Sequence, residues 1–221
     1  PTGCRVATHA IALFCVSLSA RAGVVFSTTL DSAPPGWTMA GDWEFGTPTS
    51  TAYGDTTTTH SGTRVYGVEI NGSWLSDWNT CYLTTAAIDC GDFTNVQLDF
   101  WPWLNAADFE MDPAMGDWVS IEMSTNGGAT WTTVWQFTAT VTDTKWEHIV
   151  LAVPAADRKS DVRFRWGYKL GMGYFGSWTL DDISVTGTPS APQVTNKTPA
   201  AGTVISTATC NIDVTFSAPV V

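Results

Sequence analysis

Charged residues are scarce in this chain of 221 residues, at 14% of the composition. An average globular domain holds roughly 25%. Basic residues are the rarer kind, with 10 Lys and Arg against 21 Asp and Glu, so the formal net charge is −11. A chain this acidic repels phosphate backbones, and we therefore expect no nucleic-acid partner.

Histidine is also rare, and the spacings that mark common catalytic and metal sites are missing. The 3 histidines are His9, His60 and His148. The sequence has no H-E-x-x-H, no G-x-S-x-G and no Cys/His spacing typical of zinc. Catalysis by a nucleophile and its base has no obvious residues here. No Gly-rich loop opens a helix, so nucleotide binding is equally unsupported.

Long apolar runs are missing as well. The apolar run over residues 10–18 reaches about half of the ~20 residues that a membrane helix needs. Arg5 precedes it, and Ala20-Arg21-Ala22 follows with a small-x-small pattern. The pattern predicts a secretory signal peptide over residues 1–22, with a buried helix as the alternative. We therefore expect a secreted or cell-surface protein with no transmembrane segment.

The 5 cysteines divide by position. Cys4 and Cys15 would leave with the signal peptide. Cys81 and Cys90 lie nine positions apart, and export permits a disulfide between them. Spacing alone does not bring their Cα atoms within bonding reach, so the bridge and two separate thiols both stay open. Cys210 is then the odd cysteine.

Helical periodicity is almost missing between Gly23 and Gly187, and short alternating runs recur instead. In residues 162–168 the apolar side chains share one face and both arginines share the other, as in a half-buried strand. Such runs, separated by turn residues, predict an all-β, antiparallel two-sheet sandwich. The expected strands are 24–30, 64–70, 81–88, 96–104, 118–125, 131–137, 145–153, 162–169 and 178–186.

Three segments occur in an order typical of one known module, namely Gly41–Gly46, Tyr82–Cys90 and Ser177–Val185. The last is similar to a "W-x-I-D-D-I-x-V" ending. Residues 23–188 thus resemble the MAM-like jelly-roll module of secreted bacterial proteins, without the regular cysteine set of the animal domains. The resemblance implies a jelly-roll fold. It also implies a non-catalytic binding or adhesion module, with an extracellular glycan or protein as partner.

The composition changes near the C-terminal end of the sequence. Residues 189–198 hold Pro residues that stop strand pairing, and we expect a linker there. Ile212, Val214 and Phe216 alternate with polar residues and predict a strand, which needs a partner to bury its face. The pattern over residues 199–221 resembles the opening of bacterial Ig-like domains. This implies a truncated domain and further domains of the same longer chain.

Residues 124–131 resemble the Asp-box of sialidases, with Asn126 in place of Asp. A single copy cannot build a propeller, whose blades repeat at a fixed period. Asn126-Gly-Gly supplies the positive φ angles of a hairpin turn. We therefore expect a structural hairpin in which Trp131 begins the returning strand.

Three acids, Asp108, Glu110 and Asp112, stand at alternate positions. On a strand they would share one face, and retaining glycosidases hold two carboxyl groups about 5–5.5 Å apart. Laminarinase-like jelly rolls use a comparable strand, but the order of acids here differs from theirs and Pro113 follows at once. We expect a solvated acidic loop. A cation site and a glycan-cleaving hydrolase are the alternatives.

Asp181 and Asp182 interrupt the last expected strand, and the parity of the apolar residues changes across them. Such a change predicts a β-bulge, which can present carboxylate oxygens to a hard cation. We expect a structural Ca²⁺ here, with Asp31 and Asp42 as further ligands. The alternative is that these acids cap turns or accept hydrogen bonds from backbone N–H groups.

Four tryptophans are candidate ligand contacts. Trp101 and Trp103 have the parity opposite to Phe100, and Trp74 and Trp78 lie in a loop-like stretch. Exposed indoles stack on the apolar C–H faces of sugar rings. The alternative is that they fill the second side of the sandwich. For the whole chain, the expected function is a non-catalytic binding module, with a hydrolase or an architectural spacer as alternatives.

Overall fold

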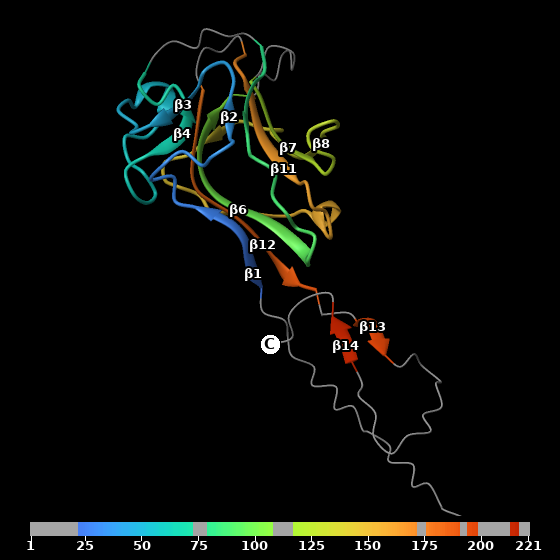
Figure 1. Cartoon of the computed structure of the whole chain (residues 1–221). Coiled ribbons are helices and arrows are strands. Elements are labelled where there is room, and N and C mark those ends of the chain that lie inside the picture. Colours follow the sequence, from blue (N-terminus) through green and yellow to red (C-terminus); the bar gives the residue numbers. More distant parts are fainter. Residues whose placement is uncertain are drawn as a thin grey trace, which may run out of the picture.

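The computed structural model describes residues 22–72, 79–107, 117–171 and 176–190, and the backbone of 194–198 and 213–216. Within these ranges the chain forms two facing antiparallel sheets, a jelly-roll sandwich (Figure 1). Helical structure in the same ranges amounts to two short 3₁₀ turns, η1 (Ala52–Gly54) and η3 (Pro154–Ala156). The all-β sandwich expected from alternation is confirmed. No helix of the described residues is long and apolar enough to cross a membrane.

The larger sheet, sheet A, has the strand order β10-β6-β12-β4-β3, with β1 paired to β12 and β9 to β6. Its two longest strands, β6 and β12, pair with each other and lie side by side. The strands of sheet A are β1 (Gly23–Thr28), β3 (Trp43–Gly46), β4 (Val65–Val68), β6 (Phe93–Ala106), β9 (Val141–Thr142), β10 (Ile149–Ala152) and β12 (Ser177–Pro189).

The smaller sheet, sheet B, has the order β2-β5-β11-β7-β8. Its central strand shows why alternation predicts the fold: Phe164, Trp166 and Tyr168 are buried, while Arg163 and Arg165 point to the other face. The strands of sheet B are β2 (Thr38–Met39), β5 (Cys81–Thr84), β7 (Trp118–Ser124), β8 (Thr132–Gln136) and β11 (Arg163–Lys169).

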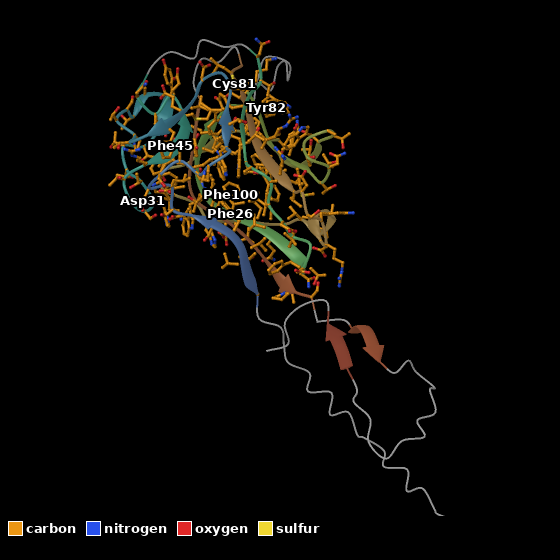
Figure 2. The ribbon with its side chains drawn as sticks, in the orientation of Figure 1. Phe26, Asp31, Phe45, Cys81, Tyr82 and Phe100 are labelled. Carbon is orange, nitrogen blue, oxygen red and sulfur yellow. The ribbon has the colours of Figure 1, made fainter. Side chains whose placement is uncertain are left out.

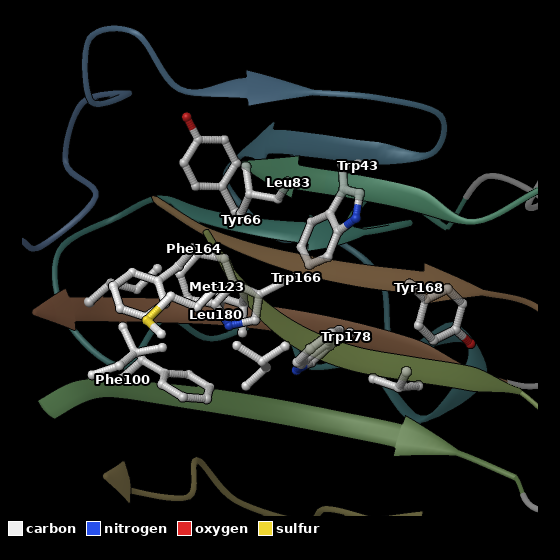
Figure 3. Packing of buried hydrophobic residues seen from close by; sticks show 14 of the residues in the cluster. Trp43, Tyr66, Leu83, Phe100, Met123, Phe164, Trp166, Tyr168, Trp178 and Leu180 are labelled. Carbon is white, nitrogen blue, oxygen red and sulfur yellow. The ribbon is translucent and has the colours of Figure 1, made fainter. Parts of the chain in front are cut away.

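The core lies between the two sheets and is rich in aromatic side chains. Trp166 and Tyr168 of sheet B meet Phe100, Trp178 and neighbouring residues of sheet A, and all four of these side chains are at most 2% exposed (Figure 3). Burying one such ring removes about 150–250 Å² from water. This apolar burial fixes which face of each strand points inward, and therefore which residues remain on the outer faces.

Every run expected as a strand contains one in the structure. Within the two sheets of the sandwich, alternation missed the strands β2, β3 and β9, of two, four and two residues. A segment that short has too few residues to show a period of two. The hairpin is also confirmed, because β7 and β8 pair and the turn between them holds Gly127 and Gly128 at φ 71° and 90°.

Cys81 and Cys90 are both buried and no bridge joins them, so the disulfide is not formed. The physical reason is the extended chain between them. Residues 81–84 pair with β11, and Ile88 bridges to Val162. An extended chain rises about 3.3 Å per residue, so the two Cα atoms lie roughly 25–30 Å apart. A disulfide needs about 4.4–6.8 Å.

A separate two-stranded sheet pairs β13 (Val194–Thr198) with β14 (Asp213–Phe216). Strand β14 lies where alternation predicts it. Strand β13 lies within residues 189–198, where a linker is expected, and the domain bounds stay a prediction. No partner for β14 could be predicted, since residues 194–198 show no apolar alternation. The signal-peptide prediction falls almost wholly outside the described residues, and the Ig-like resemblance stays a prediction.

Candidate functional site

Three aromatic side chains gather on the outer face of sheet B. Tyr82 comes from β5, Trp118 from β7, and Trp131 directly precedes β8. Each is half-buried, whereas their strand neighbours Leu83 and Val119 are fully buried in the core. These three residues are called the aromatic surface below.

Arg165 holds two of these rings in place. Its guanidinium carbon lies 3.9 Å from the ring centroid of Tyr82 and 4.2 Å from that of Trp131. A guanidinium is attracted to the electron-rich face of an aromatic ring, so both rings gain from this arrangement. Glu122 of β7 fixes the cation in turn, because Nη2 of Arg165 lies 2.5 Å from its Oε2 atom. The pair therefore orients Tyr82 and Trp131 before any ligand arrives.

Gly167 allows two rings to approach the backbone of β11. A Cβ atom at this position would lie 2.6 Å from Cε1 of Tyr82 and 2.8 Å from Cζ3 of Trp118. The two rings meet edge to face across the glycine, with centroids 6.4 Å apart. Glycine inside a strand commonly marks such a close approach. A residue with a side chain would lift both rings away from the sheet.

Polar groups accompany the rings of the aromatic surface. Arg165, whose side chain is partly exposed, lies beside the rings, whereas Ser120, which pairs with Gly167 across the strands, is fully buried. The combination of flat rings with nearby polar groups suits a ligand that has an apolar face and hydroxyl edges. None of the three residues of the aromatic surface is among the candidates that the sequence motifs single out. The sequence does hold a sign of them, because Tyr82 and Trp118 alternate with core residues along their strands, as Arg165 does. This alternation places them on the outer face of the sheet.

Three residues singled out from the sequence meet elsewhere, at a hollow on the outer face of sheet A. Asp31, Trp101 and Asp182 line this hollow, whose volume is about 510 Å³, together with Asp99 and several hydroxyl side chains. Asp31 lies well away from Tyr82 of the aromatic surface (Figure 2). The hollow is lined by acids and hydroxyls and by one indole.

Trp101 stacks with two imidazoles. The ring centroid of His60 lies 3.8 Å from that of Trp101, and the centroid of His148 lies 4.6 Å away, both nearly parallel. Each imidazole is held by a carboxylate. His60 Nδ1 lies 2.5 Å from Asp182 Oδ2, and His148 Nε2 lies 3.0 Å from Asp99 Oδ1. Imidazoles therefore occupy the ring faces that stacking on a sugar would need.

Trp103 is also engaged by protein groups. Its indole N–H donates to the carbonyl of Gly54 at 2.9 Å, and its ring meets Trp146 edge to face at 6.1 Å. These contacts agree with the alternative in which the indoles cover the second side of the sheet. The other candidates, Trp74 and Trp78 and the acids Asp108, Glu110 and Asp112, lie outside the described residues.

The bulge expected at Asp181 and Asp182 is present, because the pairing of β12 with β6 shifts between Asp181 and Ser184. Asp181 is fully buried, and its carboxylate accepts hydrogen bonds from the backbone N–H groups of His60, Ser61 and Asp182 at 2.8–3.0 Å. Burial raises the pKa of Asp181 to about 6, against the opposing effect of these bonds. The structure thus shows the alternative in which the acid binds backbone N–H groups.

The remaining acids expected at a Ca²⁺ site do not converge. Asp31 shares the hollow with Asp182, whereas Asp42 lies close enough to Glu69 to raise the pKa of that carboxyl. Among the described residues, no group of three or more His, Cys, Asp or Glu side chains is placed to hold a metal ion. The structural Ca²⁺ stays a prediction, to be checked by comparing melting curves in Ca²⁺ and in EDTA.

Glu69 and Asp55 form a buried acidic pair that the sequence did not reveal. Glu69 is 3% exposed, and neither carboxylate oxygen has a hydrogen-bond partner. Burial, followed by repulsion from Asp42, Glu44 and Asp55, raises the pKa of Glu69 to about 7. Burial raises the pKa of Asp55 to about 6, although it accepts hydrogen bonds from Thr179 and Thr56. Only the folded structure brings these acids together.

Comparison with solved structures gives likenesses at low identity. The K3 adhesin domain of Lys-gingipain from Porphyromonas gingivalis W83 is 17% identical, with 75% of this chain and 99% of that domain covered and a TM-score of 0.49. The CBM22-1 xylan-binding domain from Paenibacillus barcinonensis Xyn10C is 12% identical, with 79% and 100% covered and a TM-score of 0.47. Identities this low say nothing about the ligand. No curated protein matches the sequence.

One family model matches the chain, that of Reelin subrepeat B, over residues 71–186. The matched range covers more than half of the sequence and runs from just after β4 almost to the end of β12. It includes the aromatic surface and the acids of the last strand. The MAM-like label suggested by the motifs stays a resemblance, since this match names a different family. The chain belongs to the Reelin subrepeat B family.

Proposed function

We propose that this chain is a non-catalytic binding module whose ligand is a glycan, and that the glycan lies on the aromatic surface of sheet B. The observation that carries the proposal is the preorganised set of Tyr82, Trp118 and Trp131. Arg165 orients Tyr82 and Trp131. Tyr82 and Trp118 lie on the backbone at Gly167.

The physical case rests on what the rings offer and what binding costs. Tyr and Trp present large apolar faces on which the C–H side of a sugar can stack. Immobilising a flexible side chain on binding costs about 0.5–1.5 kcal/mol. Because Arg165 and the sheet already hold the rings, most of that cost is avoided here. The remaining polar groups are suited to the hydroxyls at the edge of the sugar.

A glycan array followed by titration calorimetry tests this proposal. The array should contain neutral xylo-, cello- and galacto-oligosaccharides, and the best ligand is then titrated into wild type, Trp118→Ala and Trp131→Ala. We expect each substitution to weaken binding at least about fivefold, since an aromatic contact contributes about 0.5–1.5 kcal/mol beyond its buried area. Val150→Ala, an exposed apolar position on sheet A, is the matched control and should bind like wild type. Unchanged affinity in both tryptophan variants would contradict the proposal.

A protein ligand is the second candidate for the same surface. Tyr, Trp and Arg are the residue types enriched in the energetic centres of protein interfaces. The array separates the two, because an adhesion module for a protein partner binds no sugar. A reducing-sugar assay on the same glycans tests the hydrolase alternative, in which Glu110 would act with Asp108 and Asp112.

We also propose that the module is exported and acts outside the cell as part of a longer chain. The support is the pattern over residues 1–22, with Arg5 before an apolar run and a small-x-small site after it. N-terminal sequencing of the secreted protein should begin at Gly23. Protein that keeps residues 1–22 and stays in the cells would contradict export.

A further inference from the structure

A small cavity lies between the two sheets and is separate from both surfaces described above. Its volume is about 150 Å³. Phe100 and Trp178 line it from sheet A, and Ile121 and Trp135 line it from sheet B. Figure 3 shows Phe100 and Trp178 in the interior of the sandwich. An apolar cavity of this size holds a molecule about as large as benzene, so a glycan chain is excluded.

The lining combines aromatic rings with carboxylates. Trp135 and Trp178 are tilted against each other with ring centroids 6.3 Å apart, and Phe100 adds a third ring. Asp143 and Glu147 are the acidic members of the lining. The side chain of Glu147 is 42% exposed, so a ligand can approach the cavity from solvent beside it.

The charges around the cavity favour a cation. Asp143 is half-buried and accepts a hydrogen bond from Leu104 N–H at 2.7 Å. Lys145 lies 3.5 Å from Glu147 and is itself 75% exposed. The two carboxylates therefore stand beside an ammonium group that is largely solvated. Aromatic rings with carboxylates nearby are the usual surroundings of a bound quaternary ammonium group.

One of the lining residues, Trp178, also holds an unpaired donor. Trp178 is 1% exposed, and its indole N–H has no hydrogen-bond partner. Leaving a buried donor unpaired is unfavourable. A ligand that carries an acceptor oxygen can satisfy this group.

We propose that the cavity lined by Phe100, Trp135, Trp178, Asp143 and Glu147 binds a small organic cation, an alkylammonium group with a nearby oxygen. The proposal does not depend on glycan binding, because it concerns different residues. It adds a second ligand class to the module.

Choline and its uncharged analogue 3,3-dimethyl-1-butanol provide the test, since they differ in charge and hardly in shape. Each is titrated into the full chain while the indole N–H signals of Trp135 and Trp178 are followed by NMR. We expect choline to shift both signals, with a dissociation constant at least tenfold lower than that of the alcohol. Equal binding of the two compounds would show a plain apolar cavity and overturn the proposal, as would no shift with choline.

Two variants complete the experiment. The side chain of Glu147 is partly exposed, so the Glu147→Gln variant should fold normally. We expect this variant to bind choline at least threefold more weakly and to bind the alcohol with unchanged affinity. Trp135→Leu keeps the site apolar and should remove most of the choline preference. Val150→Ala on β10 is the control and should bind choline like wild type. If Glu147→Gln and Trp135→Leu both keep wild-type affinity, the cation is held elsewhere and the assignment is wrong.

Discussion

The ring of Tyr82 lies directly on the backbone of Gly167, where a Cβ atom would stand 2.6 Å from Cε1 of the tyrosine. The same glycine supports Trp118 from the opposite side. The aromatic surface thus depends on one missing side chain in the central strand of sheet B. This relationship ties a property of the sequence, a glycine inside a strand of alternating residues, to the proposed binding function.

Gly167→Ala is therefore expected to weaken glycan binding at least about fivefold, because both rings must move away from the sheet. The overpacking should also lower the free energy of unfolding by about 1–3 kcal/mol. Calorimetric titration and urea denaturation measure the two effects. Gly46→Ala is the matched control, since its Cβ would meet Ile70 at an ordinary 3.5 Å. If Gly167→Ala binds like wild type, the rings do not contact the glycan.

The pair formed by Arg165 and Glu122 should behave as one unit. Glu122 is 8% exposed, so Arg165→Ala leaves a largely buried carboxylate without its cation. Removing one partner of a buried pair costs about 3–5 kcal/mol. The double variant with Glu122→Gln should cost clearly less than the sum of the two single variants. Strict additivity in urea denaturation would mean that the two side chains do not interact in solution.

Glu69 gives the protein a pH-dependent stability of known sign. Its pKa is raised from 4.5 to about 7, so the folded state binds its proton more tightly than the unfolded state. Below about pH 4.5, Glu69 is protonated in both the folded and the unfolded state, and the stability that its raised pKa contributes is fully present. That stability is lost as the pH rises through about 7. We expect Glu69→Gln to be about 1–3 kcal/mol more stable than wild type at pH 8 and similar to it at pH 4.5. A variant less stable than wild type at pH 8 would contradict this account.

Asp181 should be essential to the loop around His60. Three backbone N–H groups donate to its two oxygens, and an asparagine offers a single acceptor oxygen in their place. Asp181→Asn is expected to lower the free energy of unfolding by about 1–3 kcal/mol. Hydrogen exchange at residues 60 and 61 should speed up in this variant. Unchanged exchange there would place the stabilising bonds elsewhere.

The sequence predicted the fold well because burial in a sandwich imposes a period of two, and the strands of the sandwich with five or more residues display it. Parity across Asp181 and Asp182 predicted the bulge for the same reason. The binding surface was harder to predict, because Tyr82 comes from β5, Trp118 from β7 and Trp131 from the residue before β8. Their proximity depends on the register of β5, β11 and β7, which alternation within one strand does not encode. The contacts of Trp101 with His60 likewise depend on a loop that is distant in sequence.

The most direct test of the proposed function uses the indole N–H signals of the 12 tryptophans as position markers. The best neutral oligosaccharide from the array is titrated into the isotopically labelled chain, and each signal is assigned by single substitution. The account predicts that the signals of Trp118 and Trp131 shift in a saturable way, while those of Trp101 and Trp103 stay in place. Shifts confined to Trp101 and Trp103, with Trp118 and Trp131 unmoved, would contradict it and assign the ligand to the outer face of sheet A.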